Sequence, residues 1–241
     1  TVDIQSKVVD GQLENATGTI KGKQLEIDNV QTKEKIKTSI LNVDVKLTQK
    51  NQMINIDKMN LQTDWAKIQA GGAIPTTINS LDSFLKADAN YDLNGTFDCD
   101  AAAIVSQLPI TTGLKDNAQI TSGNITGDIK TTGTAGQKQI QAQAKLANLK
   151  GIVDGKQAAL SAPITALVKV SPDKDGVNVD NLNVSSSFLT INANGNLEQI
   201  KFDGNADLTK LQTELSHFVD IGPYKLAGQF KESAQVSLSE Q

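Results

Sequence analysis

The stretch Leu41-Asn-Val-Asp-Val-Lys-Leu47 carries an apolar side chain at every second position and a polar one between. A period of two is the spacing of a β-strand, whose successive side chains point to opposite faces of the sheet. The stretch therefore predicts a strand with one apolar face and one face in water. The same alternation returns along the chain, for example from Ala66 to Ala70 and from Ile140 to Leu146.

The pattern around this stretch is repeated later in the chain. A shift of 123 positions places Leu41 on Ile164, Val45 on Val168 and Trp65 on Phe188 (188 − 65 = 123). Agreement over a whole series of strands indicates a tandem duplication. We therefore expect two β repeats, residues 1–110 and 111–241, each ending in a short helix. Repeats of this kind are stabilised by stacking on their neighbours, which produces an elongated body.

A few short amphipathic helices and several turns are expected between the strands. Aspartate is a favoured N-cap residue, and proline often stops a helix. The expected helices run from Thr77 to Lys86, from Asp100 to Leu108 before Pro109, and from Asp207 to Phe218. Asp-Gly pairs and similar clusters mark turns. The expected turns are Asp154-Gly155, Asp203-Gly204 and Asp173 to Gly176.

The predicted fold is thus mainly β, an elongated and curved antiparallel sheet built from two tandem repeats. Its apolar positions either line an open groove or form the interior of a closed sandwich. Alternation does not distinguish the two, because both bury one face of each strand. The candidate lining residues are Leu41, Val43, Val45, Leu47, Ile54, Ile56, Met59, Leu61, Ile68, Ile164, Val168, Val170, Val177, Val179, Leu182, Val184 and Ile191.

Composition argues against several classes of partner and ligand. All 23 basic residues are lysine, the net charge is −4, and arginine is the residue that reads guanine edges and clamps phosphates. We therefore expect no nucleic-acid partner. Cys99 is the only cysteine, so we expect no internal disulfide, no metal site and no cofactor. The chain starts at Thr1 without a signal peptide or an apolar run of roughly 20 residues, and we expect it to be part of a longer protein.

Residues of the types common in active sites have simpler interpretations here. His217 beside Phe218 is typical of a helix-end residue, and no serine or cysteine has a recognisable nucleophile setting. The Pro172–Gly176 turn lacks the acidic residue that a calcium loop places five positions before its glycine. We therefore expect no enzyme. A β-solenoid lyase and an outer-membrane barrel are weaker alternatives, because the acidic cluster and the aromatic girdles are missing.

One motif is shared with a known family. The segment Thr63-Asp-Trp-Ala-Lys-Ile-Gln-Ala-Gly-Gly72 is matched by Ser186-Ser-Phe-Leu-Thr-Ile-Asn-Ala-Asn-Gly195. A small polar residue, a turn with an aromatic, and an alternating strand closing on glycine resemble the repeats of AsmA-like bacterial envelope proteins, whose relatives include TamB and YhdP. The strand, aspartate and short helix from Phe97 to Leu108 and from Ala206 to Phe218 are similar to the later part of such a repeat. The resemblance covers most of the chain.

The resemblance implies a fold, a place and a function. AsmA-like proteins are anchored in the inner membrane of Gram-negative-type bacteria and extend into the periplasm, where a curved sheet with a hydrophobic lining carries lipids. It implies lipid binding and transport in the cell envelope, with acyl-chain lipid and further repeats of a longer parent chain as partners. Membrane association would come from an anchor outside this sequence. The alternative is a non-enzymatic structural or adhesive β-repeat module with a self-buried core.

Overall fold

The computed structural model describes residues 1–9, 12–77, 91–134, 137–173, 176–196, 198–219, 221 and 223–237 of the chain. The strands are β1 (Val2–Val9), β2 (Gln12–Asp28), β3 (Lys35–Lys50), β4 (Met53–Thr63), β5 (Ala66–Pro75), β6 (Tyr91–Asp100), β7 (Ala118–Thr134), β8 (Gln137–Val153), β9 (Lys156–Ala159), β10 (Ile164–Asp173), β11 (Gly176–Ser185), β12 (Leu189–Asn196), β13 (Gln199–Asp207) and β14 (Gln229–Ser237). The helices are α2 (Ala101–Gln107), α3 (Pro109–Thr112) and α4 (Leu208–Leu215). The prediction of a mainly β chain with short helices is therefore confirmed. The helix predicted from Thr77 to Lys86 falls, apart from Thr77, outside the described residues.

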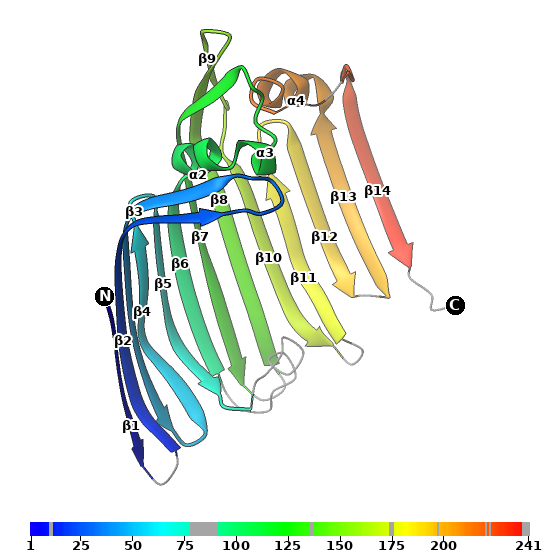
Figure 1. The fold of residues 1–241 in the computed structure, drawn as a ribbon. Coiled ribbons are helices and arrows are strands. Elements are labelled where there is room, and N and C mark those ends of the chain that lie inside the picture. Colours follow the sequence, from blue (N-terminus) through cyan, green and yellow to red (C-terminus); the bar gives the residue numbers. More distant parts are fainter. Residues whose placement is uncertain are drawn as a thin grey trace.

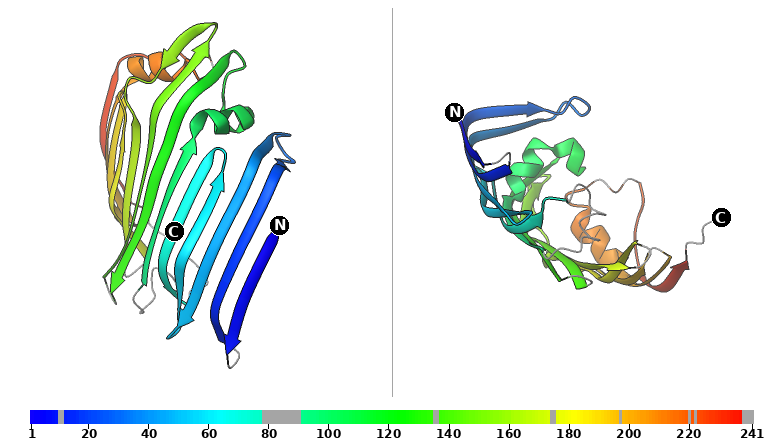
Figure 2. Two further views of the ribbon diagram at one scale, coloured as in Figure 1. Left: turned by 90° about the vertical axis from the view of Figure 1, so that its left-hand side faces the viewer. Right: turned by 90° about the horizontal axis from the view of Figure 1, so that it is seen from below.

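All of these strands form one sheet, and they lie in it in the order of the chain from β1 to β14 (Figure 1). The exception is β9, which pairs with β8 beside this path. β1 and β14 are the two edges, so the sheet is open. Seen along its strands, the sheet curves, and the helices lie inside the curve (Figure 2). Of the two architectures that alternation left open, the described residues form the single open sheet.

One face of this sheet is apolar from edge to edge. Directly opposed residues of antiparallel strands point to the same face, so a row of partners can be followed across the sheet. The central row is Ile4, Gly18, Val45, Met59, Ala70, Gly95, Ile129, Ala142, Val168, Leu182, Ala193, Phe202 and Ala234. We call the face to which this row points the inward face.

Two further rows flank the central one on the inward face. The first is Val2, Ile20, Val43, Leu61, Ile68, Phe97, Gly127, Ala144, Ala166, Val184, Ile191, Gly204 and Glu232. The second is Ser6, Ala16, Leu47, Ile56, Gly72, Leu93, Thr131, Ile140, Val170, Val179, Gly195, Ile200 and Val236. Polar side chains interrupt these rows only at Ser6, Thr131 and Glu232.

The opposite, outward face is polar over the same width. The row between the first two inward rows is Asp3, Thr19, Asp44, Asn60, Gln69, Thr96, Asp128, Gln143, Leu167, Asn183, Asn192, Asp203 and Ser233. Several neighbours in it are hydrogen-bonded across strands, as in the bond from Asn183 Nδ2 to Asn192 Oδ1 at 2.7 Å. Apart from Leu167 this row is polar, so the sheet separates aliphatic from polar side chains over most of its width.

A β-bulge in each repeat preserves this separation. In β4 the pairing with β3 shifts so that Leu47 opposes Ile56 while Lys46 opposes Lys58, which leaves Asp57 as an extra residue. In β11 the same shift leaves Asp180 as the extra residue, 123 positions later. An extra residue reverses the alternation, so Ile54 and Ile56 share a face with Met59 and Leu61 in spite of their odd spacing.

Both helical connections begin with an aspartate cap, as predicted. The Asp100 carboxylate accepts from the Ala103 N–H at 3.1 Å, and the Asp207 carboxylate accepts from the Lys210 N–H at 2.9 Å. An ideal Cβ at Gly123, two residues before Ile125 in β7, would lie 2.9 Å from the Ala101 Cβ. Helix α2 therefore covers the inward face at one end of the strands, which we call the helix end.

The two repeats correspond in detail. The Thr63 hydroxyl accepts from the N–H groups of Trp65 and Ala66 in the turn between β4 and β5. The Ser186 hydroxyl accepts in the same way in the turn between β11 and β12, from Phe188 and Leu189. β6 and β7 are paired, so one sheet continues across the expected boundary, which falls within α3.

The predicted turns had different outcomes. Asp154 and Gly155 do form the turn between β8 and β9, with φ angles of 49° and 74°. β10 and β11 meet at the Asp173–Gly176 pair, as a hairpin requires. The turn predicted at Asp203-Gly204 is wrong, because both residues lie inside β13, where Gly204 opposes Ile191. The alternation of Ile200, Phe202 and Ala206 around them outweighs the local turn signal.

Candidate functional site

The seventeen candidate lining residues all point to the inward face. Thirteen of them belong to the three inward rows traced above. The other four, Leu41, Ile54, Ile164 and Val177, are each two positions from a row member on the same strand. Residues from two repeats, separated by more than a hundred positions, therefore form one continuous aliphatic surface.

The inward face is largely uncovered by protein among the described residues. Met59 and Ile68 in the middle of the first repeat each keep 38% of their surface exposed, and Ile129 in β7 keeps 47%. At the β1 edge, the exposed fraction of Ile4 reaches 71%. Contiguous exposed apolar surface of this kind is rare on monomeric soluble proteins and marks a binding surface or an interface.

The helices close the helix end of this face. Ala101 at the start of α2 is 1% exposed, and Phe218 after α4 is 2% exposed. An ideal Cβ at Gly151 would lie 2.9 Å from Cε1 of Phe218, so a glycine in β8 makes room for this ring. The two helical segments also touch each other through a bridge between Leu114 and Val219. Among the described residues, the buried apolar side chains other than Tyr91 thus lie at the helix end.

A carboxylate fastens the first helical segment. The β2–β3 hairpin brings Glu34, 6% exposed, to the start of α3. Its oxygens accept from the Ile110 N–H at 2.7 Å, the Thr111 N–H at 3.0 Å and the Thr111 hydroxyl at 2.5 Å. Burial is the largest single effect on the pKa of Glu34 and raises it, but the hydrogen bonds, led by that of Thr111, outweigh it and lower this pKa to about 2.

A second carboxylate fastens the other segment in a different way. Glu214 lies in α4 itself and accepts from the Ser161 N–H at 3.1 Å, the Ser161 hydroxyl at 2.7 Å and the Ser187 hydroxyl at 2.8 Å. Burial raises the pKa of Glu214, but the bonds from Ser161 and Ser187 prevail and the pKa is lowered. Both repeats therefore hold a helical segment through a charged hydrogen-bond acceptor. The carboxylate comes from the β2–β3 hairpin in the first repeat and from the helix itself in the second.

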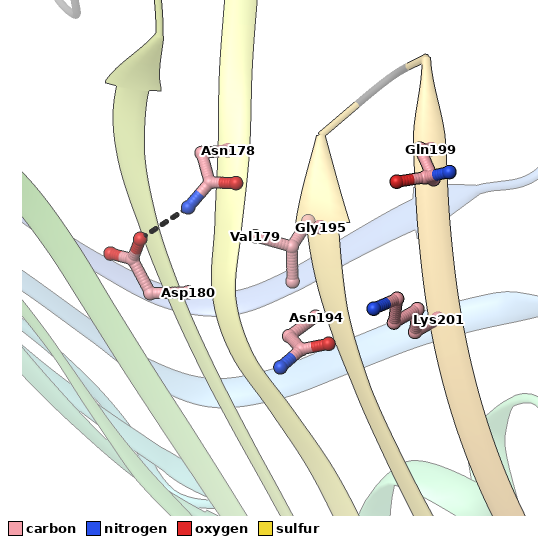
Figure 3. A pocket seen from close by; sticks show the side chains of 7 residues that line it. All are labelled: Asn178, Val179, Asp180, Asn194, Gly195, Gln199 and Lys201. Atoms are coloured by element: carbon pink, nitrogen blue, oxygen red, sulfur yellow. Dashed lines mark hydrogen bonds between the residues drawn. The ribbon is translucent and has the colours of Figure 1, made fainter. Parts of the chain in front are cut away.

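The outward face carries a shallow polar depression at the bulge of β11 (Figure 3). It measures about 420 Å³ and is lined by Asn178, Val179, Asp180, Asn194, Gly195, Gln199 and Lys201. The Asp180 carboxylate already accepts from Asn178 Nδ2 at 2.6 Å and from the Ser171 hydroxyl at 2.7 Å. Asp57 occupies the matching bulge of the first repeat, so these bonds fit a role in shaping the bulge.

The remaining residues of reactive types, Cys99 and His217, lie apart from one another. Cys99 is half-buried in β6 opposite Ile125, and burial, followed by the charge of Asp98, raises the pKa of its thiol. The His217 ring packs edge-on against Phe218, with centroids 6.4 Å apart. In the described part of the chain, no three His, Cys, Asp or Glu side chains gather as a metal site. Nor does this part contain a helix of the length and apolarity that would cross a membrane.

Sequence reasoning missed part of the inward face. The edge strand residues Val2 and Ile4 belong to it, as do Phe97 and Ile129 in the central strands. β6 and β7 hold glycine at inward positions, for example Gly127 opposite Phe97, and these small residues weaken the apolar signal. The alternation of Ile125 and Ile129 is the sequence signal that predicts an apolar face in β7 as well.

Searches of protein-family models, of curated proteins and of solved structures gave no match to this chain.

Proposed function

We propose that this chain binds the acyl chains of lipids on its inward face and takes part in lipid transport or outer-membrane biogenesis. The observation that carries the proposal is the apolar surface from β3 to β13, whose central row and the row through Ile68 contain no polar residue there, and which keeps Met59 and Ile68 more than one-third exposed. A surface of this size needs a cover, and no described protein layer provides one away from the helix end.

The chemistry of this surface suits a hydrocarbon chain. It is built mainly from valine, isoleucine, leucine, alanine and glycine, with Met59, Phe97 and Phe202, and it offers few polar groups that would select a ligand by hydrogen bonds. Each methylene taken out of water contributes about 0.8 kcal/mol, so a long acyl chain binds by area alone. A lining without specific contacts also permits the acyl chain to slide, which a conduit for lipids requires.

The place of action follows from the resemblance of the Thr63–Gly72 and Ser186–Gly195 segments to AsmA-like proteins. On that basis the chain works in the periplasm of a Gram-negative-type bacterium. It would be held at the inner membrane through a segment outside this sequence and would act without catalysis or cofactor. Its partners are phospholipids or other acyl-chain lipids and further repeats of a parent protein.

The alternative is a structural or adhesive β-repeat module, in which protein covers the inward face. The two functions differ in what co-purifies with the chain. Native mass spectrometry of the protein purified from a bacterial periplasm, followed by lipid extraction, is the first test. Bound phospholipid released by organic solvent supports the lipid function. A clean apo mass after incubation with lipid supports the structural alternative.

A pair of variants sharpens this test. Ile68→Asp places a carboxylate in the middle of the inward face, where charge opposes acyl-chain binding. Gln69→Asp, one residue on, places the same group on the outward face and serves as the matched control. We expect Ile68→Asp to lose bound lipid while far-UV circular dichroism stays close to that of the control. Equal lipid occupancy in the two variants would contradict the proposal.

A further inference from the structure

Three connections that lie far apart in the sheet meet at the helix end. They are the β2–β3 hairpin, the β6–β7 connection with α2 and α3, and the β13–β14 connection with α4. Along the sheet, β3 and β6 are three strand positions apart, and β7 and β13 are five. With neighbouring strands about 4.8 Å apart, these separations correspond to roughly 14 and 24 Å. Since the helices lie inside the curve of the sheet (Figure 2), contacts between the connections run across its concave side.

The first link joins the hairpin to the β6–β7 connection. Besides the bonds of Glu34 to Ile110 and Thr111, the Lys37 N–H of β3 donates to the side-chain oxygen of Gln107 in α2. Glu34 is 6% exposed, and a hydrogen bond to a charged acceptor contributes more than one between neutral groups. This link therefore fastens α2 and α3 firmly to the strands of the first repeat.

The last link holds α4 to the strands of the second repeat. The three hydrogen bonds of Glu214 come from Ser161, between β9 and β10, and from Ser187, between β11 and β12. Phe218 adds a buried ring against Gly151 of β8. A charged acceptor thus fastens this half as well, and its partners differ from those of the first link.

The middle link joins the two halves through a short bridge. Leu114 and Val219 pair antiparallel, and both are only half-buried. The Lys115 N–H donates to the Phe218 carbonyl at 3.0 Å, and the Lys115 Nζ donates to the Ser216 carbonyl. No carboxylate among the described residues accepts a hydrogen bond at this junction. The junction is therefore the weakest of the three links.

We infer that the three links form a strap across the concave side of the sheet, which holds its curvature and opens at the Leu114–Val219 junction. While the strap is closed, it covers the helix end of the inward face. When the junction parts, each half stays fastened by its own carboxylate, so β7 and β13 can move apart and the inward face widens. The inference goes beyond lipid binding, because it concerns the shape of the sheet whether or not a ligand is bound.

The test measures the width of the curved sheet in the full chain without lipid. Nitroxide labels are attached at Lys46→Cys in β3 and Lys201→Cys in β13, which are exposed on the outward face at the same level of the strands. Cys99→Ala removes the only native thiol, and Ala206 is the equivalent residue of the second repeat. The distance between the two labels is then measured by double electron–electron resonance.

Two double variants differ only in the sign of one charge at the junction. Leu114→Glu with Val219→Glu sets like charges directly opposite each other, which destabilises a strand pair. Leu114→Glu with Val219→Lys sets opposite charges there and is the matched control. We expect the like-charge variant to lengthen the mean label distance by roughly 5 Å, one strand spacing, while the opposite-charge variant stays near wild type.

A milder variant keeps the test decisive if the like-charge variant does not fold, which far-UV circular dichroism reports. Lys115→Ala removes only the Nζ bond to Ser216 and should broaden the distance distribution toward longer values. Equal label distances in the two double variants would overturn the inference. So would an unchanged distribution in Lys115→Ala where the like-charge variant is unfolded.

Discussion

The two repeats of this sheet agree where the backbone is shaped and differ where the helices are fastened. Both place an aspartate in the bulge, a hydroxyl in the following turn and a positive-φ glycine near the end of the next strand, at 123-residue spacing. The first repeat holds its helices through Glu34 on a hairpin, whereas the second uses Glu214 on the helix itself. Strand geometry therefore tolerates less variation than the attachment of the helices.

The equivalent glycines Gly72 and Gly195 should give the largest effects. Their φ angles are 129° and 132°, and an ideal Cβ would lie 1.9 Å from the Asp92 carbonyl oxygen and 2.1 Å from that of Gln199. We expect Gly72→Ala and Gly195→Ala each to destabilise the fold by about 4 kcal/mol or more. Urea unfolding measures this. Gly204→Ala, with no atom within 4 Å, is the control and should stay near wild type.

The aromatic residues Trp65 and Phe188 occupy equivalent positions but differ in burial. Phe188 is 5% exposed, while Trp65 is only half-buried and donates its indole N–H to the Lys37 carbonyl at 3.1 Å. We expect Phe188→Ala to cost about 3–5 kcal/mol and Trp65→Ala to cost less. Equal losses in chemical denaturation would show that the two repeats are more alike than their burial indicates.

The turn hydroxyls of Thr63 and Ser186 should contribute equally. Each accepts from two backbone N–H groups, and the bonds from Ala66 and Leu189 measure 2.8 and 3.0 Å. Thr63→Val and Ser186→Ala should each destabilise the chain by about 1 kcal/mol. Thermal unfolding of the single variants and of the double variant checks this, because sites in separate repeats should add. A loss confined to one repeat would break the comparison.

The helix fastening at Glu34 should contribute stability that depends on pH. The pKa of Glu34 is about 2 in the folded chain and about 4.5 for an unperturbed carboxyl, so the folded state favours the ionised form. The stability contributed by Glu34 is therefore present above pH 4.5 and is lost as the pH falls toward 2. Glu34→Gln should lower the unfolding midpoint at pH 7, and the difference from wild type should shrink over that interval. A pH-independent difference would contradict this assignment.

Much of the fold was predictable because its signals are local. Alternation identified strands such as β3 and β8, the 123-residue offset paired the repeats, and Asp100 and Asp207 marked the helix starts. The bulges were not foreseen, since an extra residue such as Asp57 only appears when two strands are aligned. The hydrogen bonds of Glu34 could not be predicted from the sequence either, because its partners Ile110 and Thr111 lie 76 and 77 positions away in the chain.

The candidate site was predictable in composition but not in extent. Each of the seventeen residues reaches the inward face, because the parity of a strand fixes the direction of its side chains. Alternation gave no means to tell an uncovered face from a sandwich interior, since that depends on whether a second layer packs on it. The outer rows through Val2 and Ile200 needed the strand order, which no short segment encodes.

The strand order has a consequence for how the chain reaches its native state. Each strand along the path pairs with its neighbours in sequence, except that β8 pairs with β10 across the short β9. Sheets whose pairings are mostly sequence-local close short loops and fold faster than those with distant pairings. Such a chain can add strands one at a time as it leaves a ribosome or a translocon, with the newest strand as the template for the next. When the chain is pulled from one terminus, the strands should detach one after another, and the measured force should show small successive steps.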